Sequence, residues 1–517
     1  HFFDLLLLNS RYIEHSFINE KSIEERKYQV NIVKDTINQN SLVVLPTGLG
    51  KTVIAALHIA NVLEKNSDKN CIILAPTRVL VNQHYNFLLD KMNVSEDEVK
   101  FITGEDFYEE RIEKWKGKII CSTPQILKLD IKREIVDISN FGLVIFDEVH
   151  RAIGEYAYTF IAEELGKIKE NRVIGMTASL PSEKKKVNEI IDCLRIKHIE
   201  YRDQSSEDVI PYIQKTEIEW IEVEMSQSIK KMSDLIRKAI EERQKKLRTS
   251  GLKIPSKASL KFMIDLSKRL EVDIRYKNRW DIKTSIYSSI RLFHGLNLIE
   301  TQGVNSFIEY VKRLEEKTKS SGARKLLADK NFKEACEIAR GCLLSNQKHP
   351  KIEMLNNSLD SLKQNEKAIV FASYRDSVDE IYENLISKGY KTGMLIGKSG
   401  VRGQSQKEQI TSLEKLKTGE YDIIVATQVG EEGLDVSECK LVVFYDNVSS
   451  AIRYIQRIGR TGRRSPGRMI GLITKGTRDE ANKYLIKKRL DQAKRTIESV
   501  NKSFEDKNTR EIDSYFE

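Results

Sequence analysis

The chain has 517 residues, 40% of them hydrophobic, which is enough for about three domains with packed cores and excludes a disordered chain. Its longest apolar runs have five or six residues, whereas a membrane-spanning helix needs about 20, so a membrane protein of the helical kind is excluded. The net charge is +10, but residues 221–350 hold 28 Lys and Arg against 16 Asp and Glu, which is +12 and leaves −2 for the other 387 residues. A localised basic segment is typical of a nucleic-acid partner, although a solvated helical surface has the same composition.

The first 215 residues alternate between short apolar runs and helix-like stretches. Apolar runs lie at 41–45, 71–75, 118–122, 143–146 and 172–176, and helix-like stretches include 52–63 and 79–91. This alternation predicts a parallel sheet with helices on both faces. Such sheets bind ligands at the carboxyl ends of their strands, so functional residues are expected in the turns that follow these runs.

The pattern changes between about residues 222 and 345, where apolar residues such as Met232, Ile236 and Ile240 recur at helical spacing. A Gly- and Pro-bearing break near 250–255 predicts a turn between two helices. Apolar runs then return at 368–372, 422–426, 441–445 and 469–474. The predicted fold class is therefore α/β. We expect one parallel-sheet domain at 1–215, an all-helical, basic insertion at 216–349, a second parallel-sheet domain at 350–485, and a charged helical tail or linker at 486–517.

A phosphate-binding loop is predicted where the first strand ends, in the segment Leu-Pro-Thr-Gly-Leu-Gly-Lys-Thr at 45–52. Glycines let backbone N–H groups approach phosphates, Lys51 brings a positive charge to the β- and γ-phosphates, and the Thr52 hydroxyl is suited to Mg²⁺. The strict pattern begins with glycine, where this chain has Leu45. The predicted ATP-binding residues of this loop are Pro46, Thr47, Gly48, Gly50, Lys51 and Thr52.

Two adjacent carboxylates, Asp147 and Glu148, follow the hydrophobic run at 141–146. Asp147 is suited to hold Mg²⁺ through water, and Glu148 to position and deprotonate the water that attacks the γ-phosphate. A helix cap made by two acidic residues is the simpler alternative. The position of the pair, about 95 residues after Lys51, favours the catalytic interpretation.

These motifs resemble those of superfamily 2 DExH helicases, whose two sheet domains are RecA-like. The resemblance implies that Arg26 and Gln29 recognise adenine. It implies a role in coupling hydrolysis to domain movement for His150, Thr177 and Ser179. It implies contacts with the nucleic-acid backbone for Thr77, Arg78, Gly104, Thr123 and Pro124 in the first domain and for Ser373, Arg375 and Thr427 in the second. It also places Gly433 and Asp435 at the ATP ribose.

The segment Gln-Arg-Ile-Gly-Arg-Thr-Gly-Arg at 456–463 carries three arginines at three-residue spacing, which would share one face of a helical turn. Arginines that reach the γ-phosphate on domain closure raise the rate of such reactions about 10³–10⁵-fold. By resemblance, Gln456, Arg460 and Arg463 belong to the catalytic site, with Arg460 and Arg463 as the arginine fingers. Arg457 is expected to be structural or to make an interdomain contact.

Within the superfamily, the segments 150–158, 403–409, 429–436 and 449–457 resemble the archaeal Hef and eukaryotic FANCM branch. The resemblance implies that the insertion contacts forked or branched DNA, that ATP and Mg²⁺ are the cofactors, and that the protein is cytoplasmic, archaeal and associated with the nucleoid. Members of the Hef type also carry an XPF-type nuclease with a Glu-Arg-Lys-x-x-x-Asp signature. Here Glu-Arg-Lys at 25–27 is followed by Asn31 in place of Asp, and 54 residues follow Arg463, so we expect no nuclease activity from this chain.

Two other functions are compatible with the sequence. A double-stranded-RNA-responsive ATPase of the Dicer or RIG-I-like type would share the helical insertion, so RNA is a possible partner. A clamp that binds nucleic acid without hydrolysis is disfavoured by the complete set of catalytic residues. The sequence does not identify a sliding clamp of the PCNA type or a nuclease as a partner.

Overall fold

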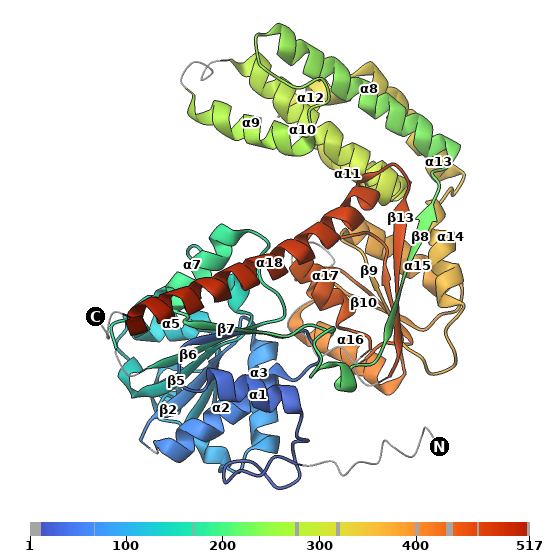
Figure 1. Ribbon diagram of the computed structural model, residues 1–517. Helices are drawn as coiled ribbons and strands as arrows, with labels where there is room; N and C mark the ends of the chain where they lie inside the picture. The colour runs from blue at the N-terminus through green and yellow to red at the C-terminus, as the bar shows by residue number, and fades with distance from the viewer. Residues whose placement is uncertain are drawn as a thin grey trace.

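The structure is a computed structural model that describes residues 12–66, 68–168, 171–273, 279–316, 321–398, 403–430, 438–462 and 465–513. It contains two parallel sheets with a helical insertion between them in the chain (Figure 1). The predicted fold class is thus confirmed. In the described ranges, no helix has the length and apolar character needed to cross a membrane.

Domain 1 is built on a seven-stranded parallel sheet. In spatial order its strands are β3 (Val99–Ile102), β4 (Ile119–Ser122), β2 (Asn70–Leu74), β5 (Phe141–Phe146), β6 (Arg172–Thr177), β1 (Ser41–Val44) and β7 (His198–Tyr201). Its helices are α1 (Lys27–Thr36), α2 (Lys51–Lys65), α3 (Arg78–Lys91), α4 (Tyr108–Lys114), α5 (Pro124–Lys132), α6 (Ala157–Leu165) and α7 (Lys184–Leu194). One hydrophobic cluster packs α1, α2 and α3 on one face, and a second packs α5, α6 and α7 on the other. Because helices cover both faces of the sheet, the residues on both sides of each strand are apolar, and the strands appear in the sequence as continuous apolar runs.

Domain 2 is built on a six-stranded parallel sheet in the order β10 (Thr392–Leu395), β11 (Ile423–Ala426), β9 (Ala368–Phe371), β12 (Leu441–Phe444), β13 (Gly467–Thr474) and β8 (Thr216–Val223). Its helices are α14 (Pro350–Leu359), α15 (Arg375–Ser387), α16 (Gln406–Thr418) and α17 (Ala451–Ile458). β12 lies between β9 and β13, so its carboxyl end is in the middle of the sheet edge that faces the insertion's base.

The first strand of the second sheet corrects the expected domain boundary. Residues 216–223 were expected to open the helical insertion, but they form β8, which pairs in parallel with β13 along its whole length. β8 is an edge strand with mostly half-exposed or exposed residues, so it lacks the apolar run that reveals the other strands. The chain therefore crosses to domain 2 before it enters the insertion.

The insertion consists of α8 (Gln227–Thr249), α9 (Leu260–Val272), α10 (Trp280–Thr301), α11 (Val304–Glu316), α12 (Ser321–Leu327) and α13 (Lys330–Leu344). The predicted break follows α8, where Gly251 has a φ of 86°. The insertion contains two separate hydrophobic cores. We call the one that includes Met232, Leu292 and Phe307 the proximal core, and the one that includes Leu247, Met263 and Ile282 the distal core. The helices α8 and α10 contribute to both cores, so they connect the far end of the insertion to domain 2.

The last helix, α18 (Arg478–Asp513), runs from domain 2 across to domain 1 (Figure 1). Its residues Ile497 and Val500 are buried in the hydrophobic cluster of domain 1 that includes α7. The side chain of Asn501 donates to the carbonyl of Ile199 at 2.8 Å. The segment expected as a separate tail or linker at 486–517 is therefore, as far as residue 513, part of a helix that joins the two sheet domains.

Candidate functional site

The predicted phosphate loop lies between β1 and α2. Gly48 and Gly50 have φ values of 84° and 79°, a left-handed conformation that favours glycine. Gly50 is the N-cap of α2, which begins at Lys51, so the positive end of the helix and its N–H groups face the loop. The Lys51 ammonium donates to the carbonyl of Leu45 at 3.0 Å. The lysine thus reaches back over the loop, where its charge can meet phosphates.

Two side chains of α1 hold the loop from behind. The Tyr28 hydroxyl donates to the carbonyl of Leu49 at 2.7 Å, and Gln29 Nε2 donates to the same carbonyl at 3.0 Å. A Cβ on Gly50 would lie 2.4 Å from Gln29 Nε2, so glycine is also required for this approach. Gln29 Oε1 is buried and has no hydrogen-bond partner among the described residues. An amide oxygen in this state fits the exocyclic amine of adenine, which donates a hydrogen bond.

Asp147 follows β5 and is almost fully buried. Its Oδ2 lies 2.9 Å from His84 Nε2, and its Oδ1 accepts from the backbone N–H of Glu148 at 3.0 Å. Burial acts to raise the pKa of Asp147, but the hydrogen bond from His84 and the charges of His84 and Lys51 outweigh it, so the pKa lies below its ordinary value. The carboxylate is therefore ionised and close to the loop lysine.

Glu148, the predicted general base, has a left-handed backbone with a φ of 49°. Its Oε2 lies 3.3 Å from His150 Nδ1. The same nitrogen lies 3.0 Å from the Thr177 hydroxyl, and that hydroxyl donates to the carbonyl of Ser179 at 3.0 Å. The structure thus brings the predicted base together with the three predicted coupling residues, across the carboxyl ends of β5 and β6.

The predicted Mg²⁺ ligands, Thr52 and Asp147, both offer oxygen atoms. Thr52 lies in the first turn of α2 with a hydroxyl, and Asp147 offers an ionised carboxylate whose pKa is lowered by its neighbours. Mg²⁺ prefers a few oxygen ligands of this kind, completed by water and phosphate oxygens. These residues fit such an ion.

The predicted arginine motif begins in α17 and approaches the phosphate loop. α17 ends at Ile458, so Arg460 lies beyond the helix and does not share a helical turn with Arg457 as expected. The backbone of Gly459 lies against Thr47, since a Cβ there would overlap the Thr47 hydroxyl oxygen. Arg460, the next residue, is buried, as is Gln456. The second predicted arginine finger, Arg463, lies outside the described residues.

Arg457, expected to be structural or interdomain, makes structural contacts within domain 2. It is fully buried, and its guanidinium carbon lies 5.0 Å from the ring centre of Phe371 and 5.2 Å from that of Phe444. Its Nη1 donates to the carbonyl of Asp446 at 3.0 Å. The arginine therefore fixes α17 to the sheet of domain 2, and this in turn positions Gly459 and Arg460.

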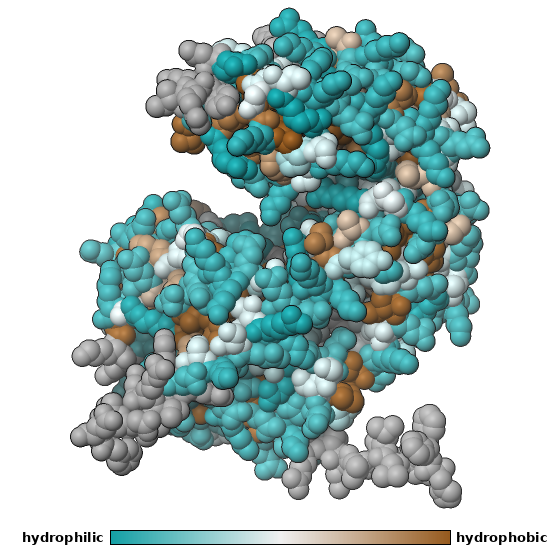
Figure 2. Space-filling view, turned by 45° about the horizontal axis from the view of Figure 1, so that its top comes forward, coloured by the Kyte–Doolittle hydropathy of each residue, from teal (hydrophilic) through white to brown (hydrophobic). Residues whose placement is uncertain are grey.

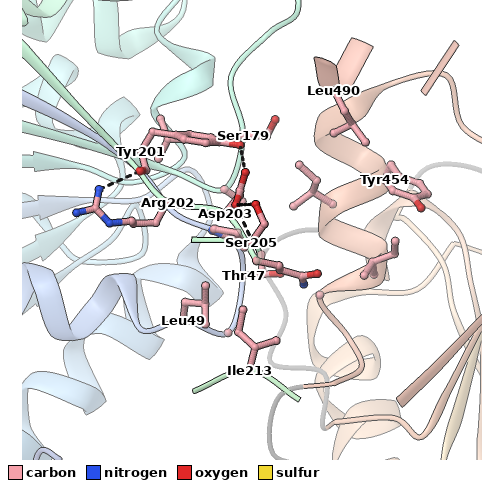
Figure 3. A pocket seen from close by; sticks show the side chains of 18 of the residues that line it. Thr47, Leu49, Ser179, Tyr201, Arg202, Asp203, Ser205, Ile213, Tyr454 and Leu490 are labelled. Atoms are coloured by element: carbon pink, nitrogen blue, oxygen red, sulfur yellow. Dashed lines mark hydrogen bonds between the residues drawn. The ribbon is translucent and has the colours of Figure 1, made fainter. Parts of the chain in front are cut away.

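A cavity of about 510 Å³ lies on the side of the loop that faces domain 2. Thr47 and Leu49 of the loop face Tyr454 of α17 and Leu490 of α18 across it (Figure 3). The Thr47 hydroxyl is buried and has no hydrogen-bond partner among the described residues. The cavity does not include Lys51 or Asp147, so it extends the nucleotide cleft and does not replace it as the site of chemistry.

The predicted backbone-gripping residues of domain 1 lie at the ends of neighbouring strands. Thr77 caps α3, its hydroxyl accepting from the N–H of Leu80 at 3.3 Å. Arg78 makes a two-pronged ion pair with Glu105, which follows Gly104. Thr123 and Pro124 open α5. Since β3, β4 and β2 are adjacent in the sheet, these turns share one edge. A phosphate would have to compete with Glu105 for Arg78.

The corresponding residues of domain 2 lie at the ends of β9 and β11. The backbone N–H and hydroxyl of Ser373 donate to the carboxylate of Asp446 at 2.7 and 2.6 Å. Arg375 opens α15 and donates to the carbonyl of Gly397. The N–H of Thr427 donates to the carbonyl of Leu395 at 3.0 Å. Gly433 and Asp435, predicted at the ribose, lie outside the described residues.

Sequence reasoning missed three residues that shape this site: Tyr28, His84 and Asp446. His84 lies three residues after Val81 and four before Leu88, both buried, so its spacing indicates only a core position. Asp446 ends an apolar run as Asp147 does, and that shared position at a strand end was the available signal. Tyr28 carries no sequence signal beyond a buried helix face.

The comparisons with known proteins agree with this geometry. Residues 26–187 match the family model of the DEAD/DEAH box helicase, and residues 350–465 match the helicase conserved C-terminal domain. Residues 228–344 match a model described as "Putative ATP-dependent RNA helicase, helical bundle".

Similar proteins come from archaea and eukaryotes. A "Putative ATP-dependent RNA helicase" of Methanocaldococcus jannaschii is 38% identical over 91% of this chain and 60% of that protein. The ATP-dependent DNA helicase mph1 of Neurospora crassa is 31% identical over 88% of this chain and 41% of its own length. The chain thus spans less than two thirds of these curated relatives. The crystal structure of the Pyrococcus furiosus Hef helicase domain is similar with a TM-score of 0.67 and 37% identity, covering 89% of this chain and 97% of that one.

The two sheet domains, the phosphate loop and the Asp-Glu-x-His motif define an ATP-dependent helicase of superfamily 2. Within that class, the chain belongs to the family of the Hef, FANCM and Mph1 helicases.

Proposed function

We propose that this chain couples ATP hydrolysis to movement along DNA and that it acts on forked or branched DNA, as in replication-fork repair and recombination. The contact between Gly459 of domain 2 and Thr47 of the phosphate loop carries the motor part of the proposal. ATP held between them would be bound from both sides, so the presence or loss of the γ-phosphate would bias the two domains toward closure or opening.

Each residue has a defined task in this cycle. Lys51 and the N-terminus of α2 would bind the phosphates, and Glu148 would orient and deprotonate water. Arg460 and Arg463 would offset the charge that the γ-phosphate gathers in the transition state. Thr52 and Asp147 would hold Mg²⁺, which would supply further charge neutralisation at the phosphates. Arg26 and Gln29 would recognise adenine, and Gly433 and Asp435 the ribose.

Movement along a strand requires a grip in each domain. We propose Thr77, Arg78, Gly104, Thr123 and Pro124 as the first grip. The second is formed by Ser373, Arg375 and Thr427. Closure and opening of the ATP cleft then shift one grip against the other.

The preference for branched DNA rests on the charge at the far end of the insertion. Residues 243–283, whose described part contributes most of the distal core, hold 13 Lys and Arg against 4 Asp and Glu in the sequence. This is +9 of the +12 that residues 221–350 carry (28 − 16). Figure 2 shows a hollow between the insertion and domain 1. A basic tip beyond this hollow is placed to meet a second nucleic-acid arm while the motor domains hold the first.

Aromatic residues accompany the charge at this tip. Trp280 begins α10 and is 71% exposed, and the Lys283 ammonium lies 5.6 Å from its ring centre. Tyr287 is exposed seven residues later, close to the same face of the helix. The Tyr287 hydroxyl donates to the carboxylate of Glu271, so Trp280 is the ring with a cation beside it. An exposed ring next to a cation is a platform on which an unpaired base can stack, and such bases occur where a duplex branches.

The alternative is a helicase that responds to double-stranded RNA. It is favoured by the description of the matching helical bundle and by the names of two relatives, from M. jannaschii and Arabidopsis thaliana, as RNA helicases. An ATPase assay with single-stranded, duplex, forked and four-way DNA and with duplex RNA of equal length separates the two. We expect forked or four-way DNA to stimulate most. Greater stimulation by duplex RNA would refute the proposed substrate.

The catalytic assignments are tested in the same assay. Lys51→Ala and Glu148→Gln should abolish turnover, while Glu148→Gln should still bind ATP because the loop is intact. Unchanged turnover in Glu148→Gln would mean that another group is the base.

The role of the tip is tested by removing its charge. Neutralising Lys245, Lys246, Lys253 and Lys257, all exposed, should weaken binding to forks and reduce its salt dependence, because fewer phosphates are neutralised. The matched control neutralises four exposed lysines around the proximal core, Lys231, Lys238, Lys330 and Lys333. Equal effects of the two sets would mean that only the total positive charge of the insertion matters for fork binding, and not its position at the tip.

A further inference from the structure

Asp446 is a buried carboxylate at the carboxyl end of the central strand β12, and it is 4% exposed. Neither its strand nor the turn after it carries a motif used in the proposed ATP site or in the two grips. Three parts of the molecule nevertheless meet at this residue: the grip of domain 2, the helix that precedes Arg460, and the base of the insertion.

The first contact is with the grip. The Ser373 hydroxyl donates to Asp446 Oδ1 at 2.6 Å, and the Ser373 N–H donates to Oδ2 at 2.7 Å. Ser373 lies in the turn between β9 and α15, and α15 begins at Arg375. The carboxylate therefore sets the conformation of the turn that presents Ser373 and Arg375.

The second contact is with α17. Arg457 Nη1 donates to the Asp446 carbonyl at 3.0 Å and lies 3.9 Å from Oδ1. Arg457 is one residue before the end of α17, and Gly459, which follows that end, lies against Thr47 of the phosphate loop. A displacement of Asp446 would thus move Arg457 and, two residues later, Gly459, which forms the domain 2 side of the ATP cleft.

The third contact is with the insertion. Gln302, the C-cap of α10, is 1% exposed, and its Nε2 donates to Asp446 Oδ2 at 3.2 Å. Its Oε1 accepts from the Ser377 hydroxyl of α15 at 2.7 Å. Gln302 is therefore held between the insertion and domain 2 by side-chain hydrogen bonds on both of its polar atoms.

The helix α10 connects this contact to the basic tip. It has 22 residues, from Trp280 beside the distal core to Thr301 next to Gln302. At 1.5 Å per residue it is a rod of about 33 Å. A tilt of the tip on binding would be transmitted along this rod to its lower end, where the side chain of Gln302 meets Asp446.

We propose that Asp446 is a positioning residue that couples nucleic acid on the insertion to the ATP site, through Gln302 on one side and Ser373 and Arg457 on the other. The inference rests on the proposed function, because it requires nucleic acid to bind the insertion. Coupling through such packed and hydrogen-bonded networks changes affinities or populations by about 5- to 150-fold.

The charge of Asp446 is suited to this role. Its two oxygens accept from Ser373 twice and from Gln302 once, and a guanidinium lies beside them. An amide has one oxygen and cannot accept at both positions. Asp446→Asn should therefore lose at least one of the three hydrogen bonds while keeping the shape of the side chain.

A neighbouring anchor allows Gln302 to be changed without separating the insertion from domain 2. The buried Lys351 ammonium donates to the carbonyls of Thr301 and Tyr445, at 3.2 and 2.8 Å, and to the carboxylate of Asp479. Thr301 and Tyr445 directly precede Gln302 and Asp446. The two backbone segments thus stay together in Gln302→Met, which removes the amide and preserves the length of the side chain.

The test compares ATPase rates without nucleic acid and with saturating forked DNA, in the full chain. We expect Gln302→Met to keep the unstimulated rate and the fork affinity within about twofold and to reduce the stimulation ratio by about fivefold or more. The ratio is informative because a loss of active protein lowers both rates equally and cancels. Asp446→Asn should reduce the ratio at least as much. Adding Gln302→Met to it should then have no further effect, because the two changes break the same connection.

The matched control is Gln406→Met, an exposed glutamine at the start of α16 that should leave the ratio unchanged. A wild-type ratio in Gln302→Met would overturn the inference, as would additive losses in the double variant. If the wild-type chain itself shows no stimulation by any nucleic acid, the proposed function fails instead, so the two failures are distinct.

Discussion

Domain 2 is joined to the insertion and to domain 1 in different ways. At the insertion joint the contacts are buried and charged: Lys351 and Asp479 are fully or almost fully buried and bonded to each other and to backbone. At the domain 1 joint, α18 packs Ile497 and Val500 on an apolar surface and adds a rim contact from Lys494 to Asp203 at 3.2 Å.

The two joints differ in what it costs to open them. Opening the insertion joint would break buried hydrogen bonds to charged groups, from the Lys351 ammonium to the Thr301 carbonyl and from Gln302 Nε2 to the Asp446 carboxylate. Such bonds are costly to leave unmade in a low dielectric. Separating an apolar patch with a polar rim exposes a small area to water and leaves no charge stranded. The difference predicts that the insertion and domain 2 move as one body, and that domain 1 moves against them with α18 as a detachable connection.

The largest expected effect concerns the buried pair. Lys351→Met leaves Asp479 buried without its cation and should lower the free energy of unfolding by about 3–5 kcal/mol. Urea denaturation at pH 7 measures this. The control is Lys475→Met, whose pair with Glu224 at 3.2 Å is about half exposed, so a change of at most about 1 kcal/mol is expected. Equal effects of the two variants would contradict the idea that burial makes the loss of the Lys351 ammonium costly.

A second carboxyl at the insertion joint gives a pH-dependent prediction. Burial raises the pKa of Glu380, on α15 beside Gly303 and Asn305, from 4.5 to about 7. Between these values the folded state keeps a proton that the unfolded state releases, so stability falls as the pH rises from 4.5 to 7. Glu380→Gln removes this loss and should stabilise the protein by at most about 3 kcal/mol at pH 8.

The gain in Glu380→Gln should become small near pH 4.5, where the folded carboxyl is protonated and the unfolded one is half protonated. Unfolding measured from pH 4.5 to 8 shows this profile. The exposed neighbour Glu383→Gln serves as control and should show no such trend. A gain that is independent of pH would mean that the improvement is due to packing.

A smaller effect is expected at the domain 1 joint. Ile497→Ala should weaken the docking of α18 by about 2 kcal/mol, because the side chain is buried against domain 1. The readout is the rate at which a protease cuts α18, or the distance between labels on α18 and domain 1, because domain unfolding should hardly change. Tyr484→Ala, on the same helix with 67% exposure, is the control. Loss of the whole fold in Ile497→Ala would show that this joint is as essential as the other.

The smallest effect is expected for the ion pair between Lys494 and Asp203 at the edge of the domain 1 joint. The pKa of Asp203 is held at about 2, since hydrogen bonds from Ser205 and the Lys494 charge outweigh the effect of partial burial. A lowered pKa means that this contribution is present above about pH 4 and is lost as the pH falls toward 2. Both partners are partly exposed, so Lys494→Ala should cost at most about 1 kcal/mol of docking at pH 7, and 1 M salt should remove the difference.

The sequence alone determined the two sheets, the helical insertion and the class of the protein. Continuous apolar runs mark strands that are covered on both faces, and the phosphate loop and the Asp-Glu pair are local motifs that a few adjacent residues define. The sequence did not predict the edge strand β8 or the docking of α18 on domain 1. β8 has no apolar run, and a charged helix has the same sequence pattern whether it is free or packed on a distant domain.

Only the tertiary structure decided which residues meet across the chain. His84 and Asp147 are 63 positions apart, and Gln302 and Asp446 are 144 apart. A side-chain hydrogen bond between such residues has no period and no local motif, because it depends on where two helices and a strand end in space. The Asp446 contacts are of this kind, which is why the connection between the insertion and the ATP site became visible only in the fold.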